Sequence, residues 1–448
     1  MKAPPIPCTG PVSRRGLIKS TMAASLGYVL GRNYIPAAWA ADDKKGKNPN
    51  TGSPNDKPSG PVPDYVVAKG KAQRVILCWM GGGPSHLDTF DPKPGTKQSG
   101  GFEKGVQAAD GLLISEKLPK LAKAGGKYMC VMRGVHSKEG DHGQASHVMH
   151  TGYREQAGVA FPSLGSIVCA EAKDGPQSEL PSYVAINGGG YGPGFYGASY
   201  APFSIGAGQA IPDLHPAMGA KNMAQRRQLL DGLDKYYGAR TGASLAVEHQ
   251  KTYDRAVKLA NSPLSKLFET SKGDKSDSYG TSGFAKACYV AKQLVAKGGV
   301  KFVEIDRGGW DNHVNVDEAT RKNCEDLDNP MAKMVEELAA DGLLSSTLII
   351  WMGEFGRTPD INANAGRDHY PRCYATMLMG GGVKGGQFVG KSNATGHEPE
   401  VGISVPDMFA TICEVCGIDS TKVRESADGR PIQVADRGSK PVPGVFGA

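Results

Sequence analysis

Five clusters of histidine and carboxylate residues recur along the chain, and each follows a short apolar run. Seven of the ten histidines fall within these clusters, so the residues are not scattered evenly. Imidazole and carboxylate groups brought together from several loops are what a divalent metal site or a general acid/base site requires. The clusters span Gly82–Asp91, His136–His150, Gly309–His313, Gly353–Thr358 and Gly366–Tyr370.

The apolar runs before these clusters predict the strands of a buried sheet. Arg74–Met80 is continuously apolar after its first residue, which indicates a strand covered on both faces. Helical patterns such as Ala285–Ala296 and Met331–Ala340 lie between several runs, an alternation typical of an α/β fold with a largely parallel sheet. The other predicted strands are Tyr128–Met132, Ser182–Ile186, Val300–Ile305, Thr347–Met352 and Tyr374–Met379.

The positions of the clusters favour one shared site. Ligands of open α/β sheets bind beyond the carboxyl ends of the strands, which is where the clusters are predicted to lie. A single Asp or His in a glycine-rich loop more often forms a turn or caps a helix. Five clusters at predicted strand ends argue against five separate local roles. The glycine-rich chain from Gly188 to Gly219 is predicted to form loops, and Met223–Tyr253 an inserted helical region.

Together these motifs resemble the DUF1501 family, a group of twin-arginine-exported bacterial proteins of undefined activity related to the alkaline phosphatase/sulfatase superfamily. The resemblance covers the chain from about Arg74 to Gly417. It implies an α/β/α sandwich around a mixed, mostly parallel sheet, with divalent metals and a Ser, Thr or modified Cys nucleophile acting on phosphate or sulfate esters. The motifs that carry it are Gly82–His86 with Asp88, Gly143–Gly152, Trp310–His313, Gly353–Pro359 and Gly366–His369.

The resemblance implies a set of metal ligands. Asp311 and His313 resemble the superfamily's late Asp/His pair, although one residue separates them where three are usual. Glu354 follows a strand where the superfamily places an Asp-His pair, and His369 resembles the last ligand. These four are the first-choice ligands of a divalent cation, either zinc, calcium, magnesium or manganese. Three further candidates are held in reserve, namely Asp368, Asp88 and His86.

The chain departs from the superfamily at the first strand and at the nucleophile. A metal-binding Asp normally ends the first strand, whereas here Gly81–Gly83 follows and Asp88 comes later. In the helix that resembles the alkaline phosphatase nucleophile helix, His142 takes the nucleophile's place. We therefore expect His142, or else Ser85 or Ser146, to be the nucleophile or acid/base group. Arg357 is expected to hold an anionic ester oxygen, with a surface salt bridge as its structural alternative.

Two functions are compatible with these residues. The first is an exported, sulfatase/phosphatase-like hydrolase that depends on a metal and acts on small-molecule or polysaccharide esters. The second is a degenerate member that binds a glycan or a protein partner without catalysis. The missing first-strand Asp and the absent Ser or Thr nucleophile favour the second. No motif pairs basic residues with interleaved aromatics, so nucleic acid is not an expected partner of this chain of net charge +7.

The N-terminus has the three parts of a twin-arginine signal peptide. Arg14-Arg15 precedes a mildly apolar stretch, Thr21–Gly31, and Ala38-Trp39-Ala40 forms a cleavage site. The apolar stretch is shorter than the roughly 20 residues that a membrane span needs, and no stable span is expected in the mature chain. The partner of this segment is the twin-arginine (Tat) export machinery, and the destination is the periplasm or the cell exterior.

The expected organisation has three parts. Residues 1–40 form the signal peptide, 41–70 a disordered Pro/Gly/Asn/Ser/Lys-rich spacer, and 71–448 an alkaline phosphatase-like α/β domain with a helical insertion around 220–280. Eight cysteines remain after removal of the signal peptide, an even number that permits disulfides without defining their pairing. Cys413 and Cys416 form a C-x-x-C pair without a second pair, which favours a packed helix end over zinc.

Replacing both Arg14 and Arg15 by Lys tests the export prediction. Lys keeps the positive charge but lacks the guanidinium fork, so the precursor should stay in the cytoplasm. The measurement is fractionation of cells followed by immunoblotting of precursor and mature protein. A matched control replaces Lys19 by Arg, which should leave export unchanged. Normal export of the double-Lys variant would show that the twin-arginine assignment is wrong.

Overall fold

The computed structural model describes residues 65–100, 104–172, 178–212, 214, 219–241 and 243–446. The predicted signal peptide and residues 41–64 of the predicted spacer lie outside these residues. Among the helices of the described ranges, none is long and apolar enough to cross a membrane.

Nine strands of the described residues form one central sheet, in the order β12-β4-β11-β8-β1-β7-β5-β6, with β15 also paired to β4. All pairs in this sheet are parallel except the two made by β11, which runs antiparallel to both β4 and β8. The strands are β1 (Arg74–Trp79), β4 (Met129–His136), β5 (Tyr183–Ile186), β6 (Phe203–Ile205), β7 (Phe302–Asp306), β8 (Thr347–Met352), β11 (Tyr374–Gly380), β12 (Gln387–Val389) and β15 (Ile403–Ser404).

The six predicted strands are confirmed, and four of them are consecutive neighbours in the sheet: β11, β8, β1 and β7. Their continuous apolar sequence has a simple cause, since successive side chains of a strand point to opposite faces. In β1, Ile76 and Cys78 pack into one hydrophobic core, whereas Val75 and Leu77 pack into another. Both faces of the sheet are therefore buried, as the sequence indicated.

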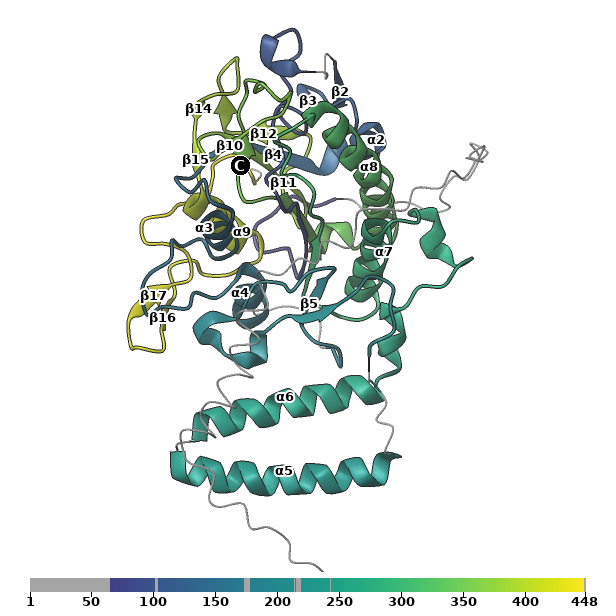
Figure 1. Cartoon of the computed structure of the whole chain (residues 1–448), viewed down its shortest axis with the longest axis vertical. Helices are drawn as coiled ribbons and strands as arrows, with labels where there is room; N and C mark the ends of the chain where they lie inside the picture. The colour runs from purple at the N-terminus through teal and green to yellow at the C-terminus, as the bar shows by residue number, and fades with distance from the viewer. Residues whose placement is uncertain are drawn as a thin grey trace, which may run out of the picture. The chain divides into compact units, whose positions relative to one another are not determined.

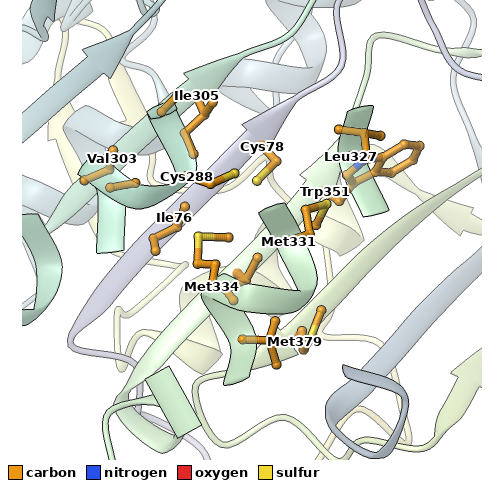
Figure 2. Close-up of a cluster of buried hydrophobic side chains, with 14 of the residues drawn as sticks. Ile76, Cys78, Cys288, Val303, Ile305, Leu327, Met331, Met334, Trp351 and Met379 are labelled. Atoms are coloured by element: carbon orange, nitrogen blue, oxygen red, sulfur yellow. The ribbon is translucent and has the colours of Figure 1, made fainter. Parts of the chain in front are cut away.

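Helices α2 (Pro119–Gly125), α7 (Gly283–Ala296) and α8 (Val316–Ala340) cover the first face (Figure 1). Figure 2 shows Met331 and Met334 lying in the same buried cluster as Ile76 of β1. The sequence predicted α8 only from Met331, but the helix begins fifteen residues earlier, at Val316. Pro330 lies inside it, and the preceding polar turns supply few apolar residues for a periodic pattern.

Helices α3 (His142–Thr151), α4 (Leu164–Glu171) and α9 (Val405–Val415) contribute to the core on the opposite face. Helices on both faces of a mixed, mostly parallel sheet make the three-layer α/β/α sandwich, so the predicted fold class is confirmed. Cys413 and Cys416 lie buried at the end of α9, and burial raises the pKa of the Cys413 thiol to about 12. All eight cysteines of the described residues are free thiols.

Two long helices, α5 (Gly219–Thr241) and α6 (Ala243–Asn261), occupy the range predicted as an insertion and lie side by side (Figure 1). The range predicted as loops, Gly188–Gly219, contains the edge strand β6, a difference from the prediction. Three residues between glycines carry too little pattern to indicate a strand. The short 3-10 helices are Lys97–Ser99, Gly126–Tyr128, Gly194–Tyr196, Ala198–Tyr200 (η5), Pro263–Phe268, Lys275–Ser278 and Leu344–Ser346.

Within the described ranges, four small antiparallel pairs lie outside the central sheet. One of them, β9 (Gly356–Arg357) with β10 (His369–Tyr370), sets Arg357 directly opposite His369. This pairing joins two of the sequence clusters. The other pairs are β2 (Gly105–Ala109) with β3 (Leu112–Ser115), β13 (Lys391–Ser392) with β14 (Pro399–Val401), and β16 (Val423–Glu425) with β17 (Pro431–Gln433).

A buried ion pair fastens the loop before β10 to the loop after β1. Arg367 Nε lies 2.8 Å from Asp88 Oδ2 and its Nη2 lies 3.0 Å from Asp88 Oδ1, so the contact is bidentate. Arg367 also donates to the carbonyls of Thr358, Pro359 and Gln98. Both charged side chains are fully buried, so each charge is compensated by the other and not by water.

Replacing Asp88 by Asn should lower the free energy of unfolding by about 3–5 kcal/mol, because it leaves the Arg367 charge buried and unpaired. Urea unfolding followed by circular dichroism measures the change. The control is Asp428→Asn, which removes an exposed ion pair with Arg430 and should change stability by less than about 0.5 kcal/mol. Equal effects of the two substitutions would contradict the structural role of Asp88.

Candidate functional site

Five polar segments meet near the carboxyl ends of β1, β7 and β8. These strands are parallel neighbours, so the loops that follow them leave the same edge of the sheet. Glu354 comes two residues after β8, and its side chain is buried. Its Oε1 accepts the backbone N–H of Gly82 at 2.7 Å, which ties the loop after β8 to the loop after β1.

The glycines after β1 allow the loop after β7 to approach closely. Gly82 has a φ of +115°, and a Cβ there would lie 2.4 Å from the backbone nitrogen of Asp311. A side chain at this position is excluded by that contact. The absence of an Asp at the end of the first strand, noted from the sequence, has a structural reason: the Trp310–Asp311 backbone occupies this space.

His142 is the first residue of α3, and it faces Glu354. Its Nδ1 lies 2.8 Å from Glu354 Oε1, and this hydrogen bond raises the pKa of His142 against the opposing effect of partial burial. Asp141 caps the helix, since its side chain accepts the N–H groups of Gly143 and Gln144 at 2.9 and 3.2 Å. The cap already satisfies those two N–H groups, so α3 does not present them to an anionic ligand.

Asp311 lies at the centre of the cluster. Its Oδ1 lies 2.5 Å from Arg357 Nη2, while its Oδ2 lies 3.4 Å from His142 Nε2. Burial alone would raise the pKa of Asp311, but the Arg357 hydrogen bond and charge outweigh it and lower the pKa to about 2. The carboxylate is therefore ionised at neutral pH.

Two further histidines border Asp311. His369 Nε2 lies 3.2 Å from Asp311 Oδ1, and His313 Nε2 lies 3.0 Å from the same oxygen. The two imidazoles approach each other, with 3.1 Å between their Nε2 atoms. Each is oriented through its other nitrogen: His313 Nδ1 lies 2.8 Å from Asp368 Oδ1, and His369 Nδ1 lies 2.8 Å from the Gly140 carbonyl.

Arg357 is buried, with 1% of its side chain exposed, so the alternative of a surface salt bridge is wrong. Its guanidinium donates to the carbonyls of Gly82 and Gly83, the latter at 2.9 Å, and to the Arg367 carbonyl at 3.1 Å. Burial lowers the pKa of Arg357, although Asp311 opposes this effect. The residue holds a positive charge against Asp311 Oδ1.

The donor set fits a small divalent cation. One nitrogen each from His142 and His369 and one carboxylate oxygen of Asp311 all lie within 4.8 Å of one another. Glu354 Oε2 and His142 Nε2 are buried and make no hydrogen bond within the described part of the chain. Arg357 lies against Asp311 Oδ1, which leaves Asp311 Oδ2, 3.4 Å from His142 Nε2, as the carboxylate oxygen without a guanidinium beside it. His313 lies on the Arg357 side of Asp311, where its Nε2 contacts Arg357 Nη1 at 3.4 Å.

Three candidates from the sequence are not brought into this group. Asp88 uses both carboxylate oxygens on Arg367. His86 Nε2 contacts the Gly396 carbonyl at 2.9 Å, and burial lowers the pKa of His86 to about 4. Ser85 is buried and its Oγ accepts the Asp88 N–H at 3.4 Å. The contacts of these three residues are structural.

Asp368 reaches the cluster indirectly, through its contact with His313. The contact given for Ser146 is a backbone one, in which its carbonyl lies 2.8 Å from His150 Nδ1.

Two carboxylates at the same edge, Asp306 and Glu304, were not among the residues predicted for the site. Asp306 ends β7, and burial followed by the charge of Glu304 raises its pKa to about 6. Glu304, also on β7, is buried and accepts from Tyr183, and His150 lies 3.3 Å away. The position of Asp306 as the last residue of an apolar run was the available indication, but the analysis started its cluster at Gly309.

Residues 72–446 match the family described as "Protein of unknown function (DUF1501)", which confirms the family resemblance. Comparison with curated proteins gives no match. The structure is similar to the PsFucS1 sulfatase from Pseudoalteromonas sp., at 13% identity and a TM-score of 0.38 over 83% of this chain and 74% of that one. It is also similar to alkaline phosphatase from the Antarctic bacterium TAB5, at 12% identity and a TM-score of 0.37 over 79% and 100% of the two chains.

Replacing Glu354 by Gln should lower the pKa of His142 toward its ordinary value of about 6.5, because the hydrogen-bonded negative charge is lost. The measurement is an NMR titration of the histidine ring signals in chelator-treated protein, with His142 assigned through a His142→Gln variant. The Asp360→Asn variant removes a carboxylate beside His397 and serves as the control. A His142 pKa that is the same in Glu354→Gln and wild type would refute the pairing.

Proposed function

Because the chain belongs to the DUF1501 family, whose description names no activity, we propose from its own site that it is a metal-dependent hydrolase of phosphate or sulfate esters. The single observation that carries this proposal is the convergence of His142, Asp311 and His369 within 4.8 Å at the carboxyl edge of the sheet. Two buried atoms, Glu354 Oε2 and His142 Nε2, make no hydrogen bond to any residue that the structure describes, and this supports a ligand there.

The types of ligand atom indicate which metal ion the site would bind. Two imidazole nitrogens and one carboxylate oxygen suit zinc better than calcium, magnesium or manganese, which prefer oxygen ligands. Bound at this position, the cation would polarise the ester and lower the pKa of a coordinated water. The protein's part is to hold the donor atoms with their orienting contacts, such as Glu354 on His142 and the Gly140 carbonyl on His369.

Glu354 determines what His142 can do. A proton shared between His142 Nδ1 and Glu354 Oε1 leaves the lone pair of Nε2 directed toward the Asp311 side of the site. From there His142 either ligates the cation or takes the proton of the attacking water. In the second role, the water oxygen forms the new bond to phosphorus or sulfur, the ester bond to the alcohol breaks, and the alcohol leaves with a proton from solvent.

Arg357 supports an anionic substrate. It places a buried guanidinium beside Asp311 and so offsets negative charge at the point where a phosphate or sulfate group would enter. Three of its donor contacts go to carbonyls of the surrounding loops, which hold the group rigidly. Its donor groups are occupied by these carbonyls, Asp311 and His313, so we infer that it acts on a bound anion through its positive charge and not through a hydrogen bond.

A second candidate function is a non-catalytic binding protein for a glycan or protein partner. The observation in its favour is that Arg357 already neutralises one oxygen of Asp311, while His142 stands where the superfamily carries Ser or Thr. Because the Arg357–Asp311 ion pair already balances the charge of Asp311, the site can keep its arrangement without a metal. The metal content of the natively purified protein distinguishes the two candidates.

We also propose that the protein acts in the periplasm or outside the cell, after export by the twin-arginine machinery. The Arg14-Arg15 pair and the Ala38-Trp39-Ala40 site support this location. Small-molecule or polysaccharide esters are the substrates that such a location and site would meet.

The proposal is tested by metal content and ester hydrolysis measured on the same preparations. The purified protein should carry a stoichiometric divalent metal by plasma mass spectrometry and hydrolyse p-nitrophenyl phosphate or p-nitrophenyl sulfate. Asp311→Asn and His369→Ala should lose the metal and reduce kcat/KM by about a hundredfold or more. His142→Ala separates its two roles: loss of metal indicates a ligand, and retained metal with lost turnover indicates the acid/base group.

The control is His249→Ala on α6, which removes another His–Asp contact, with Asp234, and should change neither metal content nor rate. A wild-type protein that binds no divalent metal and hydrolyses neither ester would contradict the hydrolase and leave the binding protein.

A further inference from the structure

Helix α5 exposes large apolar side chains to solvent. Leu229, Leu233 and Tyr236 are 68%, 56% and 58% exposed, and two more large apolar residues of the helix are exposed with them. Five of the thirteen exposed large hydrophobic residues in the described chain thus lie on one 23-residue helix, so the exposure is concentrated. The two others on α5 are Met223 and Tyr237.

These side chains share one face of α5. The spacing of four and three residues from Leu229 to Leu233 to Tyr236 places them along a single stripe. The face toward α6 is different, since it carries the buried Asp234, whose carboxylate lies 3.1 Å from His249, and Arg227, which pairs with Asp254. Contact with α6 therefore uses polar residues and leaves the apolar stripe of α5 uncovered by α6.

The charged residues of α5 also differ between its exposed surface and its paired positions. Among the side chains described from 222 to 240, the exposed charged ones are all cationic: Arg226, Lys235 and Arg240. The two acidic residues, Asp231 and Asp234, pair with Arg227 and His249. The guanidinium of Arg240 also lies 4.5 Å from the centre of the Tyr236 ring. The open surface of α5 therefore combines aliphatic and tyrosine side chains with positive charge.

We propose that this surface of α5, defined by Leu229, Leu233, Tyr236, Arg226 and Arg240, docks the protein on an anionic lipid bilayer surface. A bilayer with anionic headgroups removes the aliphatic side chains from water and neutralises the arginines at the same time. Tyrosine is a favoured residue at the level of the headgroups. A helix of this length, about 35 Å at 1.5 Å per residue, lies along such a surface.

A second copy of the chain fits this surface less well. If two α5 helices pack antiparallel about Leu233, then Arg226 of one copy faces Arg240 of the other, and parallel packing sets identical arginines together. Either arrangement brings like charges together beside the apolar stripe. The charge pattern therefore selects an anionic partner over self-association.

The connection to the rest of the protein supports docking through α5. Helix α6 is held to η5 by its own hydrogen bonds, with Arg255 donating to the carbonyls of Ala198 and Ser199, and Glu248 accepting from Ser199. Since α6 makes these contacts and also packs on α5, a docked α5 would remain joined to the α/β domain through α6.

Vesicle co-sedimentation of the full chain tests this inference. Binding should be seen with vesicles of phosphatidylcholine mixed with phosphatidylglycerol, be much weaker with phosphatidylcholine alone, and fall as salt is raised. The double variant Leu229→Asp/Leu233→Asp should bind about tenfold more weakly, and Arg226→Glu/Arg240→Glu about as much. All variants share the N-terminal segment, so their differences report on α5.

The matched control is Val423→Asp, which places a new charge on an exposed apolar residue of β16 and should leave vesicle binding unchanged. Circular dichroism and thermal unfolding verify that each variant is folded, and the arginine pair tests the inference if the leucine pair is not. Binding that the α5 variants leave unchanged, or no binding to either vesicle, would overturn the inference. A dimer in light scattering that Leu229→Asp/Leu233→Asp dissolves, with no vesicle binding, would instead identify a self-association surface.

Discussion

The buried guanidinium of Arg357 is the interaction on which the arrangement of the site depends. Its donors reach the carbonyls of Gly82 and Gly83 after β1, the carbonyl of Arg367 before β10, and the carboxylate of Asp311 after β7. A buried cation is tolerated only when its donors and its charge are satisfied. Because these acceptors come from three separate loops, the loops have to meet before the cation can be buried. The site and the edge of the sheet are therefore assembled together.

The carboxylates at this edge of the sheet carry more negative charge than the positive charge of Arg357 can balance. Glu354 and Glu304 are both buried, and Asp306 joins them at the end of β7. Histidines contact two of these carboxylates: His142 pairs with Glu354, and His150 pairs with Glu304. One oxygen of Glu354 still has no hydrogen-bond partner among the described residues. An added cation would complete this set, which is the physical basis for expecting a metal in this family member.

The core of the fold was predictable because its strands are buried on both faces. A strand such as β8, Thr347–Met352, is buried throughout, and its sequence is apolar without alternation. Elements without an apolar pattern were harder to recognise. The edge strand β6 is three residues long, and the first half of α8 buries polar residues such as Thr320, Asn323 and Asp328. Prediction from sequence therefore succeeded where the buried residues are apolar, and it failed where they are polar or few.

The sequence by itself determined which residue types stand at the strand ends, and therefore that His142, Asp311, Glu354 and His369 are available at one edge of a parallel sheet. It ranked Asp311 above Asp88 only through the family resemblance, since both are carboxylates in glycine-rich loops. Only the tertiary structure decided between them. Asp88 is neutralised by Arg367, which lies 279 residues away along the chain, while Asp311 keeps one oxygen facing His142. The physical reason is that the role of a carboxylate depends on which charge the fold brings beside it, and partners so distant in sequence leave no local pattern.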